Sequence, residues 1–559
     1  MALGQCHWRR VLRENEASNI AGNYYLAVLL VLPLLILKFF VPHLLQNEAG
    51  KLVSTRQIFE PFFLSHDWVV ARGQGDNVFD LIFAAIIAPF WLLLRDSVLV
   101  ALAGRILCWS LLFLSLCKLA RTLAIEWYAL AFGLTIWICT DQSLGALEWV
   151  FGSGEPKCLA YALLFLALDA VLRKRLGVAG VYCGLATSCH ILVGAWGTVA
   201  LGGALLLCFR DYGWRRVLPF SLVSASVSIP IAVISLSFNL PGTPAMRRAA
   251  DQLAVLFCDP FHIDPVYFGG WEELAALILL GGCAAIAFRK LLPSLQAKLL
   301  ASFLAMLSLE FLAGVLARQL NLFWYLKSFP FRVADVLVLL FFLLSVPCLT
   351  MRWIRGLASQ FGKLDRRPQS DRRRVAMIVA LGLPLLAALV FFLGGVLVKD
   401  LPVFVTEWRG YALGEKDSWH EMTGWIRTNT PPGAVFLAPP WEFTFWIDAE
   451  RAQVVSYKRP PHNVRMVEWH KRLTAANGKP FSARGAGIKK ELRQNFPELT
   501  IPQLESIRDQ YGAEYFLTTK RRDDFAGNLV HANSEYWLYS LPQNSVLRFP
   551  SAKDQKSTD

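Results

Sequence analysis

Acidic and basic side chains gather in the stretches between the apolar blocks of this sequence, and these stretches hold the residues that could do chemistry. The first contains Asp67, within Ser65-His66-Asp67-Trp68, and Asp76, which precedes Asn77. A carboxylate anchored between membrane-embedded elements is desolvated, so its pKa can rise toward that of a general base. Loops also contain many solvated Asp residues, so spacing alone leaves both roles open.

A second stretch contains Glu148 and then Glu155-Pro156-Lys157, directly before an apolar block. A carboxylate here could hold a hard divalent cation such as Mg²⁺ or Mn²⁺, and Lys157 could meet a phosphate. Glu148 and Glu155 are therefore candidate metal ligands, and Lys157 is a candidate phosphate ligand. The structural alternative is helix capping and anchoring at the membrane interface.

Further ionisable residues lie at the ends of other apolar blocks. His262 belongs to an Asp-x-x-His-x-Asp pattern at residues 259–264, which lacks a full set of metal ligands; a turn made by two prolines is the alternative. His190 closes one block, where a packing role is the alternative to ligand binding. Arg332 opens another block, and it could pair with a phosphate or with Asp335, three residues on.

Membrane helices must position these residues. The chain has 559 residues, of which 55% are apolar and 18% charged, whereas soluble domains average about 45–50% and about 25%. The net charge of +14 lies largely in short runs that abut apolar blocks, which argues against nucleic-acid binding. A span needs about 20 apolar residues, and we predict about eleven spans. They run roughly at 24–45, 97–117, 122–140, 158–172, 176–192, 194–209, 217–238, 272–288, 299–317, 333–350 and 375–398.

The short apolar block at residues 80–94, which contains Pro89, decides the topology. If this block lies along the membrane surface, most loop Lys and Arg residues fall on the same side as the N-terminus, as the positive-inside rule requires. This arrangement predicts a cytoplasmic N-terminus. It also predicts that the loops 46–96, 141–157 and 239–271, and the chain from about Lys399 onward, face outward.

The domain organisation follows from this topology. Residues 1–398 are predicted to form the transmembrane domain and residues 399–550 an outer α/β domain, with a disordered tail at 551–559. Within the outer domain, helical patterns at 417–427 and 501–512 alternate with short apolar strands at 434–437 and 513–518. P-loop, dinucleotide-binding, zinc-protease and serine-hydrolase motifs are absent from the sequence, which argues against ATP-driven transport by this chain alone.

Three segments resemble uncharacterised bacterial members of the GT-C superfamily of integral-membrane glycosyltransferases. EPKCLAYALLFLALDAVLRKRLGVAGVYCGLATSCHILVGAW is similar to their E-P-x-x-x-A…H-x-x-x-G segment. WIRTNTPPGAVFLAPP, followed by VVSYKRPP, is similar to the opening of their outer domains, and LFCDPFHIDP resembles a degenerate Pro-His-His motif. The layout of spans and loops is also similar. The chain departs from better-known members, such as protein mannosyltransferases and aminoarabinose transferases, because its first loop has no Asp-x-Asp or Asp-Glu pair.

The resemblance implies an inverting transfer of a sugar from a polyprenyl-phosphate donor to a glycan, lipid or protein acceptor of the cell envelope. The reaction would take place at the periplasmic face of a bacterial inner membrane. A first-loop acid, Asp67 or alternatively Asp76, would deprotonate the acceptor. Arg332, Lys157 or a divalent metal near Glu148 and Glu155 would stabilise the leaving phosphate. His190 and His262 would contact the substrate.

Two other functions compete with this one. A transporter or flippase of a lipid-linked glycan would depend on intramembrane charges, here Arg105, Asp169 and Glu310, although the sequence shows no paired halves. A catalytically inactive assembly scaffold would explain the missing first-loop acid pair.

Overall fold

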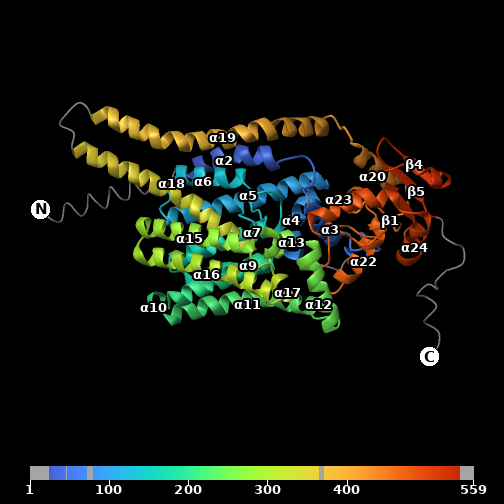
Figure 1. Cartoon of the computed structure of the whole chain (residues 1–559), viewed down its shortest axis with the longest axis horizontal. Coiled ribbons are helices and arrows are strands. Elements are labelled where there is room, and N and C mark those ends of the chain that lie inside the picture. Colours follow the sequence, from blue (N-terminus) through green and yellow to red (C-terminus); the bar gives the residue numbers. More distant parts are fainter. Residues whose placement is uncertain (1–23, 46, 72–79, 364–369, 542–559) are drawn as a thin grey trace.

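The computed structural model describes residues 24–45, 47–71, 80–363 and 370–541. The predictions for the N-terminal residues, for Asp76 and for the tail at 551–559 lie outside these ranges. The described chain forms a long helical bundle with a smaller domain at one end, which contains the C-terminal strands (Figure 1). We call this end of the bundle the outer end, and the opposite one the distal end.

Apolar helices make up the bundle. Five are long and apolar enough to cross a membrane: Ser97–Thr122, Trp214–Asn239, Gly270–Leu291, Ser294–Gln319 and Arg332–Trp353. Their presence supports the expected polytopic membrane protein, while the count of eleven spans stays a prediction. The bundle helices are α2 (Tyr24–Phe39), α5 (Ser97–Thr122), α6 (Trp127–Cys139), α7 (Pro156–Leu172), α8 (Leu176–Cys189), α9 (Ile191–Leu207), α11 (Trp214–Asn239), α15 (Gly270–Leu291), α16 (Ser294–Gln319), α18 (Arg332–Lys363) and α19 (Ser370–Ala412).

Short helices fill the connections between bundle helices. At the outer end they are α3 (Glu48–Phe59), α4 (Leu81–Leu94), α12 (Pro244–Gln252), the π-helix η2 (Leu253–Cys258), α13 (Pro260–Ile263), α14 (Pro265–Phe268) and α17 (Phe323–Leu326), and α10 (Phe209–Tyr212) lies at the distal end. Helix α4 has 14 residues, so it is only about 21 Å long and shorter than the hydrocarbon core of a bilayer.

The segment that contains α4 returns to the end of the bundle from which it started. Tyr24, at the start of α2, donates its hydroxyl to the carbonyl of Ile125, beyond the end of α5, at 2.5 Å. Arg105, near the start of α5, donates to the carbonyl of Phe39, at the end of α2, at 2.8 Å. Helices α2 and α5 are therefore antiparallel, and the chain between them begins and ends at the outer end.

The C-terminal domain contains a mixed five-stranded sheet in the order β2-β1-β3-β5-β4. Strand β1 pairs in parallel with β2 and β3, where Phe436 lies opposite Tyr515, while β3–β5 and β5–β4 are antiparallel. Two strands lie where the sequence pattern places them. The strands are β1 (Val435–Leu437), β2 (Ala452–Gln453), β3 (Tyr515–Thr518), β4 (Leu529–Ala532) and β5 (Trp537–Ser540).

Helices pack around this sheet and complete an α/β unit. Phe436, Phe516 and Leu538 are fully buried in its core. The helices are α20 (Ser418–Asn429), α21 (Phe445–Asp448), α22 (Met466–Asn477), α23 (Ala486–Asn495) and α24 (Ile501–Tyr511), with 3-10 turns η3 (Phe496–Glu498) and η4 (Asp523–Asn528).

A buried ion pair ties the outer end of the bundle together. Arg105 of α5 is 0% exposed, and it donates from Nε and Nη2 to the two carboxylate oxygens of Glu48, at 2.8 and 2.6 Å. Its remaining hydrogen bonds go to backbone carbonyls just beyond α2. Glu48 also accepts the backbone N–H of Gly154, at 2.8 Å. A charge in an apolar helix needs such partners because the membrane interior offers no water.

Breaking this pair should destabilise the protein strongly. We expect Arg105→Met and Glu48→Leu each to cost about 3–5 kcal/mol, because each leaves one buried charge uncompensated. The double variant should cost less than the sum of the two. The measurement is the thermal unfolding midpoint of each variant in one detergent. Lys298→Met, which removes an exposed pair with Asp211, is the control and should leave the midpoint unchanged. Strictly additive losses would contradict the coupling.

Candidate active site

Glu148 is the centre of a charged cluster at the outer end of the bundle. Its side chain is buried, with 1% exposed, in the loop before α7. The ammonium of Lys157, in the first turn of α7, lies 2.6 Å from Glu148 Oε1. The guanidinium of Arg332, at the start of α18, forms an ion pair with Glu148 Oε2. We call these three residues the Glu148 cluster.

Polar contacts hold the loop of Glu148 in shape. Gln142 accepts the backbone N–H groups of Val150 and Phe151 and donates to the carbonyl of Phe151. The carboxylate of Asp335 accepts backbone N–H groups of Leu144 and Ala146. The sequence left Arg332 to pair with a phosphate or with Asp335. In the structure Arg332 pairs with Glu148 and not with Asp335, whose carboxylate binds the backbone. The phosphate-binding role of Arg332 stays a prediction.

Both predicted histidines lie close to the Glu148 cluster. His262, in α13, places Nδ1 2.5 Å from the carbonyl oxygen of Ala146, so this nitrogen carries the proton and donates it. His190 lies between α8 and α9, and its Nδ1 accepts the N–H of Val193, at 3.2 Å. The charges of Glu148 and Arg332 act on both rings. Segments far apart in the sequence therefore converge on one site.

The charge states within the site follow from this packing. Burial alone would raise the pKa of Glu148, but Arg332, Lys157 and His262 outweigh burial and lower it to about 2. Burial and the charge of Arg332 lower the pKa of His262 to about 4. At neutral pH the carboxylate and two cations of the Glu148 cluster thus lie beside the neutral imidazole of His262. Because its folded-state pKa is depressed, Glu148 stabilises the fold above its unfolded value of about 4.3, and this contribution is lost as the pH falls toward 2.

A second ionic group, centred on Asp80, joins the outer end of the bundle to the C-terminal domain. Asp80, before α4, lies 2.5 Å from the ammonium of Lys51 in α3 and 2.9 Å from Nη2 of Arg459. The two cations outweigh burial and hold the pKa of Asp80 below its usual range. Arg459 fits against α3 because residue 50 is glycine: a Cβ there would lie 1.9 Å from the guanidinium. Lys51 also acts electrostatically on His190, which connects this group to the Glu148 cluster.

Asp67 lies at the joint between the first outer loop and the C-terminal domain. Its Oδ1 accepts the backbone N–H groups of Val69 and Val70, at 2.8 and 3.0 Å. Its Oδ2 accepts the indole N–H of Trp446, at 2.7 Å, and the backbone N–H of Gln453, at 3.0 Å. Burial raises the pKa of Asp67 even though these four donors oppose the rise. Its role as a base stays a prediction.

Glu148 and Glu155 do not form a metal site as they are arranged. Both oxygens of Glu148 face cations, and Glu155 accepts the hydroxyl of Ser153, at 2.6 Å, while its other oxygen lies 3.6 Å from the Lys157 ammonium. The described ranges contain no group of three or more His, Cys, Asp or Glu residues that could hold a metal ion. The donor set suits an anion better than a cation, because two cations already point into it.

Glu48, Lys51, Asp80 and Arg459 are not among the candidate site residues predicted from the sequence. Two of them left a signal. A lone Arg105 inside an apolar span requires a partner, and Glu48 is an acid in the outer loop that follows the first span. Arg459 lies in the VVSYKRPP segment. No pattern pairs Lys51 with Asp80 or either with Arg459, because these contacts join distant segments.

Residues 417–476 match a family described as a domain of unknown function, DUF6798. No curated protein matches the sequence. Among solved structures, the chain is similar to ArnT from Cupriavidus metallidurans, crystallised with bound undecaprenyl phosphate. The identity is 14% and the TM-score 0.44, with 92% of this chain and 96% of that chain covered. A likeness at this level assigns neither activity nor ligand to this chain.

Removing the central carboxylate should make the protein respond to anions. In Glu148→Gln, Arg332 loses its buried counter-charge and Lys157 keeps only the longer contact with Glu155, so we expect a lower unfolding midpoint than in the wild type. Added inorganic phosphate should raise the midpoint of the variant more than that of the wild type, because a bound anion replaces the lost charge. Glu60→Gln, at an exposed pair with Arg56, is the control. An equal response of all three proteins would refute an anion site here.

Asp67→Asn should loosen the contact between the first outer loop and the C-terminal domain. The amide has one acceptor oxygen, so either the Trp446 and Gln453 donors or those of Val69 and Val70 lose their partner. We expect a loss of about 1–3 kcal/mol for the buried unpaired donors. Hydrogen exchange should become faster at residues 445–453. An unchanged exchange rate together with lost catalytic activity would favour the role of Asp67 as a base.

Proposed function

We propose that this protein is an integral-membrane glycosyltransferase that takes its sugar from a polyprenyl-phosphate donor. The observation that carries the proposal is the Glu148 cluster, a water-poor site with two cations at the junction of the bundle and the C-terminal domain. The similarity of three segments to GT-C enzymes supplies the reaction class. The acceptor is a glycan, lipid or protein of a bacterial cell envelope, and the reaction takes place at the periplasmic face of the inner membrane.

The cluster suits the phosphate of such a donor. The Lys157 ammonium has three N–H donors, and Glu148 Oε1 occupies one of them. Glu148 holds Lys157 and Arg332 in place, so their positive charges need not reorganise when a phosphate arrives. Fixed cations in a low-dielectric site stabilise negative charge that develops on a leaving group. His262 is neutral at pH 7 and donates from Nδ1 to Ala146, so its Nε2 offers an acceptor for a sugar hydroxyl and not a donor for the phosphate.

An apolar groove of about 600 Å³ supports the assignment of a lipid-linked donor. It lies between α2 and α5 and is lined almost entirely by apolar side chains. Phe40 and Trp109 line it, with their rings 6.3 Å apart. Trp109 donates its indole N–H to the carbonyl of Gly152, at 2.9 Å, in the loop that carries Glu148. A polyprenyl chain in this groove would hold its phosphate near the cluster.

In the proposed reaction, an acceptor oxygen attacks the anomeric carbon with inversion. The bond between this carbon and the phosphate oxygen breaks, polyprenyl phosphate leaves with the bonding electron pair, and an acid of the first outer loop accepts the acceptor's proton. Of the two predicted bases, Asp67 already accepts four hydrogen bonds, which favours Asp76. Asp80 is a third acid at the end of this loop, although Lys51 and Arg459 lower its pKa and so make it a weaker base. The C-terminal domain, through Arg459, would help to place the acceptor.

The first test measures consumption of a panel of polyprenyl-phosphate sugars by the purified protein, followed by mass spectrometry. We expect one donor to be consumed, slowly by water or faster with its acceptor. Arg332→Gln and Lys157→Gln should each reduce the rate about 10²–10³-fold, the range found when a transition-state charge contact is removed. Lys298→Gln, at the exposed pair with Asp211, is the matched control and should keep full activity.

The same assay assigns the base and tests the main alternative. Asp67→Asn, Asp76→Asn and Asp80→Asn, each assayed well below its own unfolding midpoint, should differ by orders of magnitude in activity, with Asp76→Asn the least active. A transporter would instead depend on Glu310, a buried carboxyl in α16 with no hydrogen-bond partner among the described residues. If neither the wild type nor any variant consumes a donor, and Glu310→Gln abolishes glycolipid movement, the protein is a transporter and not a glycosyltransferase.

A further inference from the structure

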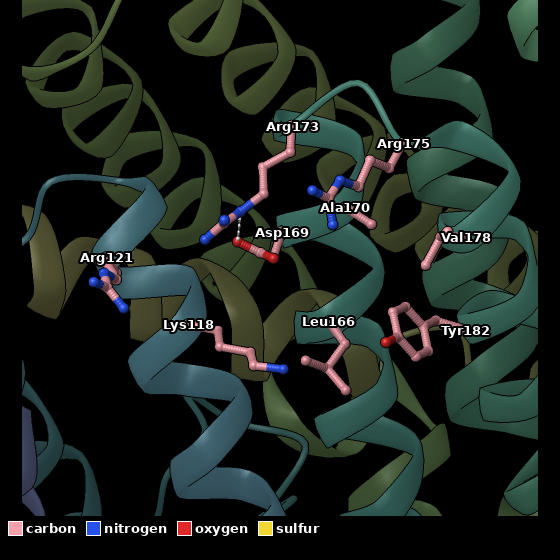
Figure 2. Close-up of a pocket in the computed structure, with 9 residues that line it drawn as sticks. All are labelled: Lys118, Arg121, Leu166, Asp169, Ala170, Arg173, Arg175, Val178 and Tyr182. Carbon is pink, nitrogen blue, oxygen red and sulfur yellow. Dashed lines mark hydrogen bonds and ion pairs between the residues drawn. The ribbon is translucent and has the colours of Figure 1, made fainter. Parts of the chain in front are cut away.

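A second charged site lies at the distal end of the bundle, away from the Glu148 cluster. It is a cavity of about 240 Å³ between α5, α7 and α8, and we call it the distal pocket. Four cations line it: Lys118 and Arg121 from α5, and Arg173 and Arg175 from the turn between α7 and α8. Figure 2 shows Lys118 and Tyr182 pointing into the space from opposite walls.

The residues that line the distal pocket carry more positive than negative charge. Asp169 is the acid that lines the cavity, and its Oδ1 accepts a hydrogen bond from Arg173 Nε, at 2.9 Å (Figure 2). The same oxygen accepts the Thr122 hydroxyl, at 2.5 Å. Within the described part of the chain, the side chains of Lys118, Arg121 and Arg175 have no hydrogen bond or ion pair. Like charges gathered around one cavity repel each other, so a bound anion would stabilise the pocket.

The depth of the cavity indicates what kind of anion fits. Leu166 and Tyr182 lie six residues inside the ends of α7 and α8 that border the pocket, which places them about 9 Å deeper along the helices than the basic turn. Val178 lines the cavity and is 46% exposed on the outside of the bundle. Lys118 lies four residues inside the end of α5. The cavity therefore has the basic turn at its rim and, farther in, one ammonium beside apolar side chains.

We propose that the distal pocket binds the phosphate of an anionic phospholipid from the adjacent leaflet, with the glycerol and first acyl carbons against Leu166, Val178 and Tyr182. This site is independent of the proposed glycosyl transfer. A soluble phosphate compound shares the anionic group but would leave the apolar wall uncovered, so it is the alternative source that the experiment must separate. Arg173 positions Asp169 and the turn, while Lys118, Arg121 and Arg175 contact the phosphate.

The test uses the full-length protein in nanodiscs of phosphatidylcholine, with or without phosphatidylglycerol. We expect phosphatidylglycerol to raise the unfolding midpoint of the wild type by several degrees, and to remain bound in native mass spectrometry after mild delipidation. Lys118→Gln/Arg121→Gln should lose most of both effects. Arg215→Gln/Arg216→Gln removes the same charge at the same end of the bundle but outside the pocket, and it should keep both effects.

Several results would overturn the proposal. An equal loss in the two double variants would reduce the effect to general surface charge. If millimolar inorganic phosphate stabilises the wild type to the same extent as phosphatidylglycerol does, and displaces the bound lipid, the pocket binds a soluble anion. If Lys118→Gln/Arg121→Gln is unstable in phosphatidylcholine alone, the single variant Arg175→Gln serves in its place. A lipid effect unchanged in Arg175→Gln would also refute the site.

Discussion

The compensation of buried charge is the constraint on which the outer end of this molecule depends. Arg105 sits inside an apolar helix, where an uncompensated guanidinium is prohibitively costly. Glu48 and three backbone carbonyls saturate its donors. These contacts fix where α2 ends and where α3 begins, and Glu48 adds the loop of Gly154. That loop carries Glu148, so the Arg105–Glu48 pair positions the candidate site although it has no part in the proposed reaction.

The Arg105–Glu48 pair and the Glu148 cluster differ in whether their cations can still bind a ligand. Arg105 has its donors directed at fixed protein acceptors, which leaves it nothing to offer a ligand. Lys157 and Arg332 instead share the carboxylate of Glu148, and Lys157 also rests 3.5 Å from the centre of the Trp149 ring. Lys157 also lies 3.6 Å from a carboxylate oxygen of Glu155, so the two cations are balanced by two carboxylates and held rigid before any ligand arrives. Pre-organised charge of this kind favours binding of a phosphate at little reorganisation cost.

Sequence patterns predicted the elements better than they predicted the contacts between them. Apolar blocks and the alternation after residue 417 indicated membrane helices and a C-terminal sheet because burial and periodicity are local properties. The same loops yielded Glu148, Lys157, His262 and Arg332, which the structure brings together. The sequence did not predict which side chains pair. By spacing, Asp335 was a possible partner for Arg332, and only the fold shows that the Asp335 carboxylate binds the backbone. The contact of Arg459 with Asp80 joins residues 379 positions apart.

Positive charge at the two ends of the bundle has different physical consequences. At the outer end, Glu148 pairs with the cations and burial excludes water, so a phosphate there meets a low dielectric and strong, short-range forces. At the distal pocket the cations are exposed, and salt screens them beyond roughly 8–10 Å. Binding there must gain from the apolar wall as well as from charge. The outer site is therefore suited to stabilising a reacting phosphate, and the distal pocket to holding a lipid at equilibrium.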